Sequence, residues 1–103
     1  MVKRRLVIIE ILPTAKDDLN DIYQYIAKDS VKYAKIEKQL IIEAIEQLYT
    51  FPDSGVPFNH RNIEVRRLAF RNYLIIYRYK TQLLLEVLTI HHHARDLSNN
   101  TSI

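Results

Sequence analysis

The spacing between apolar residues changes at one place in the chain, and this change constrains the fold more than any other feature. Between residues 15 and 48, apolar side chains recur every three or four positions, as in an amphipathic α-helix. From residue 63 they recur every second position, as in a β-strand. Residues 50–62 lie between the two patterns and contain two of the three prolines and the only glycine, so we expect a loop there.

The helical part divides into two helices. The first is expected over residues 14–28, with Thr14 and Asp17 spaced as in a capping box. The pattern breaks before Ser30, which is a suitable N-cap for a second helix over residues 31–49. Because almost no linker separates them, the two helices are expected to form a hairpin.

A first strand is expected ahead of the helices, over residues 6–12. Basic residues precede this apolar run, as in a secretory signal, but the run is short and contains Glu10, so we interpret it as a strand. Pro13 ends it. Three further strands joined by short hairpin connections are expected at residues 63–70, 72–79 and 83–91.

The order β-α-α-β-β-β predicts an α+β fold. We expect one domain over residues 1–103, with a polar tail from about residue 97. The helical hairpin should pack on one face of a small, curved, mostly antiparallel sheet. The other face should be at least partly open, because a chain of 103 residues is too short to cover both.

Composition excludes several classes of site. The chain has no cysteine, hence no disulfide, thiolate nucleophile or cysteine zinc site, and this fits a reducing compartment such as the cytoplasm. No apolar stretch is long enough to predict a membrane span. The net charge of +3 is mildly basic and permits a polyanionic partner. Glycine-rich phosphate loops and the GxSxG motif are absent.

Five arginines in or near the strands are candidates for binding an anionic ligand or target. A guanidinium group suits phosphate because it donates in a fixed fork and stays charged. Singly, each arginine can equally be a solvated side chain whose stem covers apolar surface. As a set, we expect them to converge on one end of the sheet, with adjacent Arg66 and Arg67 on opposite faces. They are Arg66, Arg67, Arg71, Arg78 and Arg95.

Three consecutive histidines end the last predicted strand. His91 and His93 should share one face, with His92 on the other. Two histidines make half a metal site, and a third ligand such as His60 would have to come from elsewhere, so we expect no metal. The remaining alternatives are a partly exposed strand end, or a histidine beside arginines that moves a proton at a phosphate ester.

Two tyrosines near the arginines have two possible roles. Tyr73 and Tyr77 could stack a nucleic-acid base, since aromatic rings beside arginines do so. Their spacing along the strand favours core packing for both.

Four motifs follow one another along the chain. They are A-x-x-D-L-x-D-I-x-x-Y-I from Ala15, L-x-x-F-P-D-S-G from Leu48, R-R-L-x-x-x-x-Y-L-I-I-Y-R from Arg66, and H-x-x-A-R-D from His91. In this order and spacing they resemble the RelE/ParE superfamily, the toxins of bacterial type II toxin–antitoxin systems. The resemblance covers residues 6–97, and His92 lies nearest the histidine of the family.

The resemblance implies a small basic cytoplasmic toxin that inhibits growth and takes part in plasmid stabilisation. It implies no cofactor. It also implies a cognate antitoxin that wraps an acidic segment over the sheet and helices and forms a hetero-oligomer with the toxin. RelE-like members are ribosome-dependent endoribonucleases that cut mRNA, whereas ParE-like members poison DNA gyrase and are not nucleases.

Two departures from RelE-like nucleases favour the ParE-like group. Leu74 follows Tyr73, where those nucleases commonly have an arginine, and the segment before residue 63 has only Arg61 in place of a lysine-rich stretch. We therefore expect a gyrase inhibitor. The first alternative is a RelE-like endoribonuclease, and the second is an inactive or general nucleic-acid-binding relative.

A nuclease would need catalytic groups that the resemblance assigns only in part. His92, Arg95 and Arg67 would be its catalytic residues. The glutamate that some members carry on the second helix matches Glu43 or Glu46 only loosely.

Overall fold

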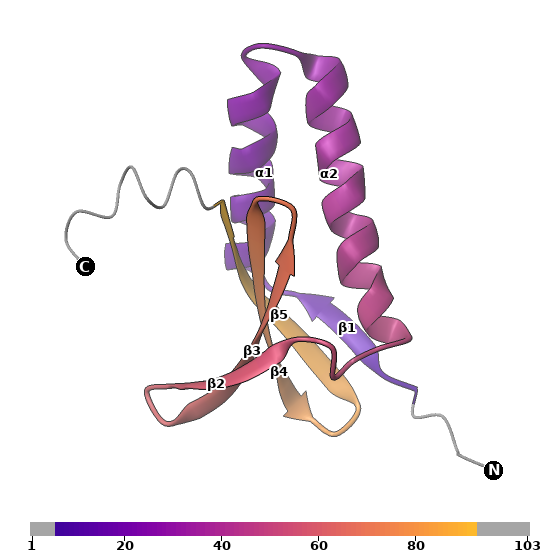
Figure 1. The fold of residues 1–103 in the computed structure, drawn as a ribbon, viewed down its shortest axis with the longest axis vertical. Helices are drawn as coiled ribbons and strands as arrows, with labels where there is room; N and C mark the ends of the chain where they lie inside the picture. The colour runs from indigo at the N-terminus through magenta and orange to yellow at the C-terminus, as the bar shows by residue number, and fades with distance from the viewer. Residues whose placement is uncertain (1–5, 93–103) are drawn as a thin grey trace.

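The computed structural model describes residues 6–92, and Figure 1 shows two helices side by side on a twisted sheet. This confirms the expected α+β fold with a helical hairpin. Five strands form one sheet in the order β1-β5-β4-β3-β2, in which β1 and β5 are parallel and the other neighbours antiparallel. The elements are β1 (Ile8–Ile11), α1 (Pro13–Ala27), α2 (Val31–Glu46), the 3₁₀ turn η1 (Gln47–Tyr49), β2 (Val56–His60), β3 (Ile63–Phe70), β4 (Tyr73–Thr81) and β5 (Leu84–His92).

The two helices begin in different ways. The Ser30 hydroxyl accepts a hydrogen bond from the Tyr33 backbone N–H at 3.1 Å, which confirms the predicted N-cap of α2. The capping box predicted at Thr14 is wrong, because α1 begins one residue earlier, at Pro13, and its N-cap Leu12 makes no side-chain bond. Proline suits this position, since its missing N–H would have no helical partner there.

The largest difference from the sequence prediction is β2, which lies within the segment expected to be a loop. It pairs with β3 through a two-residue turn in which Arg61 and Asn62 have φ angles of 52° and 66°. Such turns usually contain glycine, so Arg-Asn gave no hairpin signal. Pro57 also argued against a strand, but β2 is an edge strand, where the missing N–H is tolerated.

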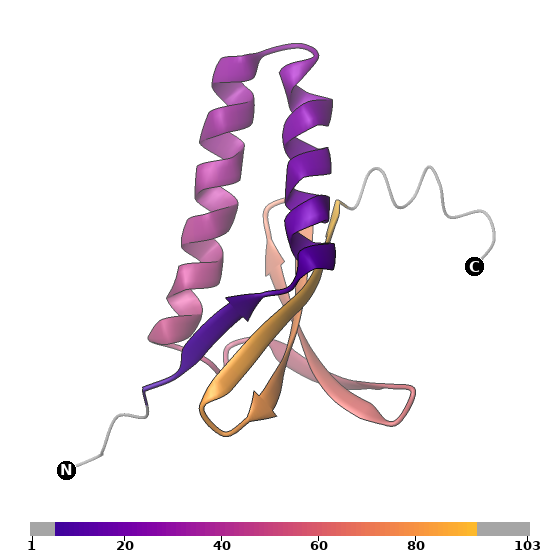
Figure 2. The same cartoon turned by 180° about the vertical axis from the view of Figure 1, so that it is seen from behind.

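The core lies between the helical hairpin and one face of the sheet. Side chains from both helices pack against residues of β4 and β5. The ribbons in Figures 1 and 2 show the two helices next to each other above these strands. The fully buried large side chains include Tyr77, Ile41, Ile45, Leu48, Ile75, Leu85 and Val87. Burial of such side chains stabilises the fold by roughly 1.5–3 kcal/mol each before entropy is counted.

Helix α1 covers the part of β5 that extends beyond β1. The Asp18 carboxylate accepts hydrogen bonds from the Ile90 backbone N–H, at 2.9 Å, and from the Thr89 hydroxyl. The β1 pairing reaches only Val87, so these bonds satisfy a sheet edge that β1 leaves unpaired. They also fix the end of β5, where His92 lies.

Candidate functional site

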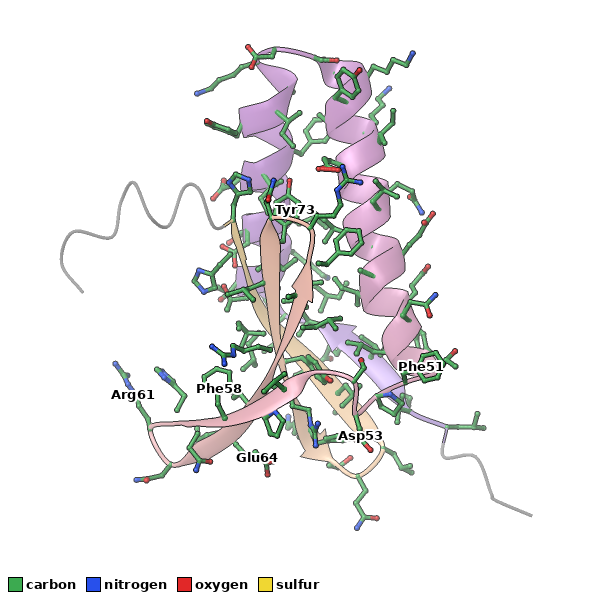
Figure 3. All side chains as sticks on the ribbon, in the orientation of Figure 1. Phe51, Asp53, Phe58, Arg61, Glu64 and Tyr73 are labelled. Carbon is green, nitrogen blue, oxygen red and sulfur yellow. The ribbon has the colours of Figure 1, made fainter. Side chains whose placement is uncertain are left out.

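A pocket of about 410 Å³ lies between the helical hairpin and the β3–β4 turn. It brings together three of the residues predicted for a site, Arg71, Tyr73 and His92, and Figure 3 shows Tyr73 at the start of β4 next to the helices. Its walls are largely apolar and aromatic. They come from Ile22, Tyr25 and Ile26 on α1, from Tyr33, Ile36, Glu37 and Leu40 on α2, and from Asn72 in the turn.

Glu37 organises the polar side of this pocket. The Tyr73 hydroxyl donates to its carboxylate at 3.4 Å, and Arg71 Nε lies 3.4 Å from the other carboxylate oxygen. Burial, followed by the charge of Glu37, raises the pKa of Tyr73 to about 12. Tyr73 therefore stays neutral and keeps donating at any physiological pH.

The ring of His92 packs among aromatic side chains. Its centroid lies 5.0 Å from that of Tyr73 and 6.5 Å from that of Tyr25. The pairing of Tyr73 with His92 puts both on the helix side of the sheet, while His91 is exposed and pairs with Leu74 on the other side. The predicted opposite facing of His91 and His92 is therefore confirmed. His93 lies outside the described residues.

Tyr77 lies in a second cluster, which holds the loop before β2. Its hydroxyl donates to the Pro52 carbonyl at 2.8 Å and accepts from the Gly55 backbone N–H at 2.9 Å. Burial is the main cause that raises the pKa of Tyr77. Tyr73 and Tyr77 are 2% and 0% exposed, which fits core packing and leaves neither ring open to a base.

Arg66 and Tyr79 complete this second cluster. Arg66 Nη1 donates to the carbonyls of Asp53 and Gly55 at 3.0 and 2.9 Å. The Tyr79 hydroxyl donates to the Asp53 carboxylate at 2.6 Å. Burial, with the hydrogen bond to Asp53 as the next cause, raises the pKa of Tyr79 to about 12.

The predicted arginines are distributed over several places. Arg71 lies at the first pocket, whereas Arg66 and Arg78 line a smaller one of about 260 Å³. Arg78 forms an ion pair with Glu86 at 3.0 Å, and Glu86 is only 5% exposed. Arg67 lies over the Phe58 ring at 5.1 Å. Arg95 lies outside the described residues.

The two described residues named as catalytic for a nuclease do not face one another. His92 pairs with Tyr73, and Arg67 pairs with Ile76, three residues further along β4. Paired residues share a face and successive residues alternate, so an odd offset places His92 and Arg67 on opposite faces of the sheet.

Two kinds of feature are absent from the described residues 6–92. No group of three or more His, Cys, Asp or Glu side chains in this range is arranged to hold a metal ion. Within the same range, no helix is both long enough and apolar enough to cross a membrane.

Comparison with known proteins identifies the family. Residues 9–97 match the family model described as the ParE toxin of the type II toxin–antitoxin system parDE. The chain belongs to the ParE toxin family. This match confirms the resemblance to RelE/ParE toxins. The family consists of toxins of toxin–antitoxin systems, so an antitoxin is the implied partner of the chain.

A solved ParE-type structure shares the fold. The chromosomal ParDE system from P. aeruginosa contains a chain with a TM-score of 0.71 and 21% identity, over 84% of this chain and 96% of that one. No curated protein matches.

Proposed function

We propose that this ParE-family chain inhibits DNA gyrase and that a cognate antitoxin neutralises it. The observation that carries the proposal is the family match over residues 9–97. The positions of His92 and Arg67 on opposite faces also favour a binding poison over a nuclease built on those two residues. Gyrase acts in the bacterial cytoplasm, so the proposal places the toxin there, and the mode of action needs no cofactor.

An antitoxin segment has an apolar surface available along α2. The pocket of about 410 Å³ and a second one of about 380 Å³, between α2 and β3, share Leu40. Large apolar side chains at their margins are exposed, namely Tyr33, Ile36 and Phe51 at 66%, 45% and 59%. Monomeric proteins rarely leave a long apolar surface open, so we assign this one to the apolar side chains of the acidic antitoxin segment.

The purified full chain should inhibit the supercoiling activity of gyrase in vitro. Induced expression should cause filamentation and DNA-damage signalling while translation continues, and co-expression of the antitoxin should restore growth. Rapid loss of translation with cleaved mRNA would instead support the RelE-like alternative. Unaffected growth and unaffected supercoiling would support an inactive relative.

The nuclease alternative has one observation in its favour. His92 lines the same pocket as Arg71 and Tyr73, so a histidine, a guanidinium and a phenol lie close together. If this pocket cleaves RNA, then His92→Ala should abolish mRNA cleavage while the protein stays folded.

The remaining arginine assignments stay part of the proposal. Arg67 and Arg71 are exposed whereas Arg66 is only partly exposed, so we propose Arg67 and Arg71 as the described residues of the set that meet the target. Arg78, which is paired with Glu86, and Arg95 are proposed as secondary contributors.

A further inference from the structure

The hairpin of β2 and β3 extends from the body of the toxin as an arm. We define the arm as residues 56–67, and Figures 1 and 2 show it pointing away from the helices. All six residues from 59 to 64, on both strands and in the turn, are exposed. The outer part of the arm, residues 59–64, is an exposed two-stranded ribbon, and such a ribbon contributes little to stability, so we ask what else it does.

The base of the arm is firmly held. Arg66 bonds to the loop carbonyls of Asp53 and Gly55, and Val65 is buried at 4% exposure. At the tip, the left-handed φ angles of Arg61 and Asn62 form the tight turn that matches the natural twist of two strands. The arm is therefore a preformed ribbon.

The free arginine charge of the described chain is concentrated on this arm. Residues 6–92 contain five arginines, and three of them lie within 4.0 Å of a carboxylate. The two without such a partner in that range are Arg61 and Arg67, both on the arm. Arg67 is held over Phe58, which reduces the side-chain entropy that it would lose on binding.

One face of the arm carries no acidic residue. The pairings of His60 with Ile63, Phe58 with Val65 and Val56 with Arg67 place these six side chains on one face. Glu64, the only acidic residue of the arm, pairs with Asn59 on the other face. Figure 3 shows Phe58 and Glu64 on opposite sides of the arm, with Arg61 at its tip.

Pro57 argues against strand addition as the use of this arm. A partner that extended the sheet at β2 would need backbone N–H donors along its outer edge, and a proline there removes one. The arm is therefore suited to binding through its acid-free face and its tip.

We propose that the acid-free face and the tip of the arm bind the phosphate backbone of double-stranded DNA. The major groove of B-DNA admits a two-stranded β-ribbon, and guanidinium groups pair well with the phosphates along its edges. The inference rests on the proposed function for its biological meaning, because gyrase holds duplex DNA while it acts. The toxin would then contact the enzyme and its DNA together.

The test is titration of a fluorescent duplex of about 20 base pairs with the full toxin chain, followed by anisotropy. The double variant Arg61→Ala/Arg67→Ala should bind at least tenfold more weakly at low salt. If these two residues each neutralise one phosphate, their contribution should fall about tenfold between 50 and 200 mM salt, and the variant should lose that part of the salt dependence.

Matched variants separate charge from structure. Arg61→Lys/Arg67→Lys keeps the charge and should retain most of the affinity. Lys32→Ala/Lys35→Ala removes two exposed positive charges from α2, away from the arm, and should bind DNA like the wild type. Thermal unfolding of each variant establishes that it is folded.

Several outcomes would overturn the proposal. The first is that the wild type does not bind duplex DNA. The second is that the variant Arg61→Ala/Arg67→Ala binds as tightly as the wild type. The third is that Lys32→Ala/Lys35→Ala loses as much affinity as Arg61→Ala/Arg67→Ala. Equally tight binding of duplex RNA, whose deep and narrow major groove excludes a ribbon, would also contradict it. Loss of gyrase inhibition with unchanged DNA affinity would make the arm a protein contact.

The test of DNA binding by the arm and the test of gyrase inhibition can succeed or fail independently of each other. A wild-type chain that binds DNA through the arm but leaves supercoiling unchanged would refute gyrase inhibition and leave the arm assignment intact. A chain that inhibits gyrase but does not bind DNA would refute the arm assignment alone.

Discussion

Gly55 and Tyr77 touch so closely that any side chain at position 55 would clash with the Tyr77 ring. The Gly55 N–H donates to the Tyr77 hydroxyl at 2.9 Å, and a Cβ atom added to Gly55 would lie 2.7 Å from Cε1 of the Tyr77 ring. Tyr77 is fully buried, and its hydroxyl also donates to the Pro52 carbonyl, so the ring is held on both sides. The φ angle of Gly55 is not positive, so its backbone conformation does not require glycine. Glycine is required at this position by the close contact with Tyr77.

The first prediction concerns this contact. Gly55→Ala should lower the free energy of unfolding by about 1–3 kcal/mol, because the added methyl overpacks a site against a fixed ring. Urea denaturation of the purified chain measures the change. Gln82→Ala, in the exposed β4–β5 turn, is the control and should stay within about 0.5 kcal/mol of the wild type. An equal stability for Gly55→Ala would show that the loop yields easily.

The second prediction concerns the free edge of β5. Asp18→Ala should destabilise the chain by about 1.5–3 kcal/mol, since hydrogen bonds to a charged group are lost and the Ile90 N–H is left unpaired. Asp17→Ala changes the neighbouring exposed aspartate and should have little effect. Hydrogen exchange should show faster exchange of the Ile90 amide in the Asp18 variant only. Similar losses in both variants would point to general helix electrostatics instead.

The third prediction is a pH dependence in alkaline solution. The pKa of Tyr73 rises from its ordinary value of 10.0 to about 12 in the fold, so the folded state holds the proton more tightly than the unfolded state. Its contribution to stability is present below pH 10 and is lost as the pH rises toward 12. Thermal unfolding between about pH 9 and 12 should therefore show falling stability.

Two variants assign this alkaline loss to its source. Tyr73→Phe cannot ionise at this position and should show a shallower decline than the wild type. Tyr79, whose pKa is also raised to about 12, contributes in the same direction, so Tyr79→Phe should remove a further part. An unchanged slope in the double variant would rule out both tyrosines as the cause.

The fourth prediction separates two adjacent arginines. Arg67→Ala should relieve toxicity on induced expression without unfolding the chain, because Arg67 is exposed and has no acidic partner among residues 6–92. Arg66→Ala should destabilise the chain by about 1–3 kcal/mol, because the loop carbonyls of Asp53 and Gly55 lose their donor. Growth curves and melting temperatures of both variants provide the measurement.

We expect Arg95→Ala to relieve toxicity as Arg67→Ala does. Full toxicity in both Arg67→Ala and Arg95→Ala would contradict the assignment of basic target contacts.

The sequence predicted the elements whose apolar periodicity is strong. Both helices and β3, β4 and β5 lie within a few residues of their expected bounds, because long periodic segments bury one face whatever else surrounds them. The strand β2 was missed because Pro57 and an Arg-Asn turn resemble loop residues. Only its pairing with β3 makes this segment a strand.

The interaction partners of the arginines could not be predicted from the sequence. Arg66 binds a loop that precedes it by more than ten residues, and Arg71 meets Glu37 from a helix on the far side of the pocket. Such ion pairs depend on the twist of the sheet and on where the hairpin packs. Strand alternation alone did place Arg66 and Arg67 on opposite faces, as the pairing with β4 confirms.

The parallel pairing of β1 with β5 has a consequence for synthesis of the toxin. Ile8 lies opposite Leu84, so the first and last strands of the described chain meet side by side. During translation β1 emerges early and finds no partner until β5 has left the ribosome. A nascent chain therefore lacks the sheet on which α1 and α2 pack, and it can take up the toxin fold only after β5 has been synthesised.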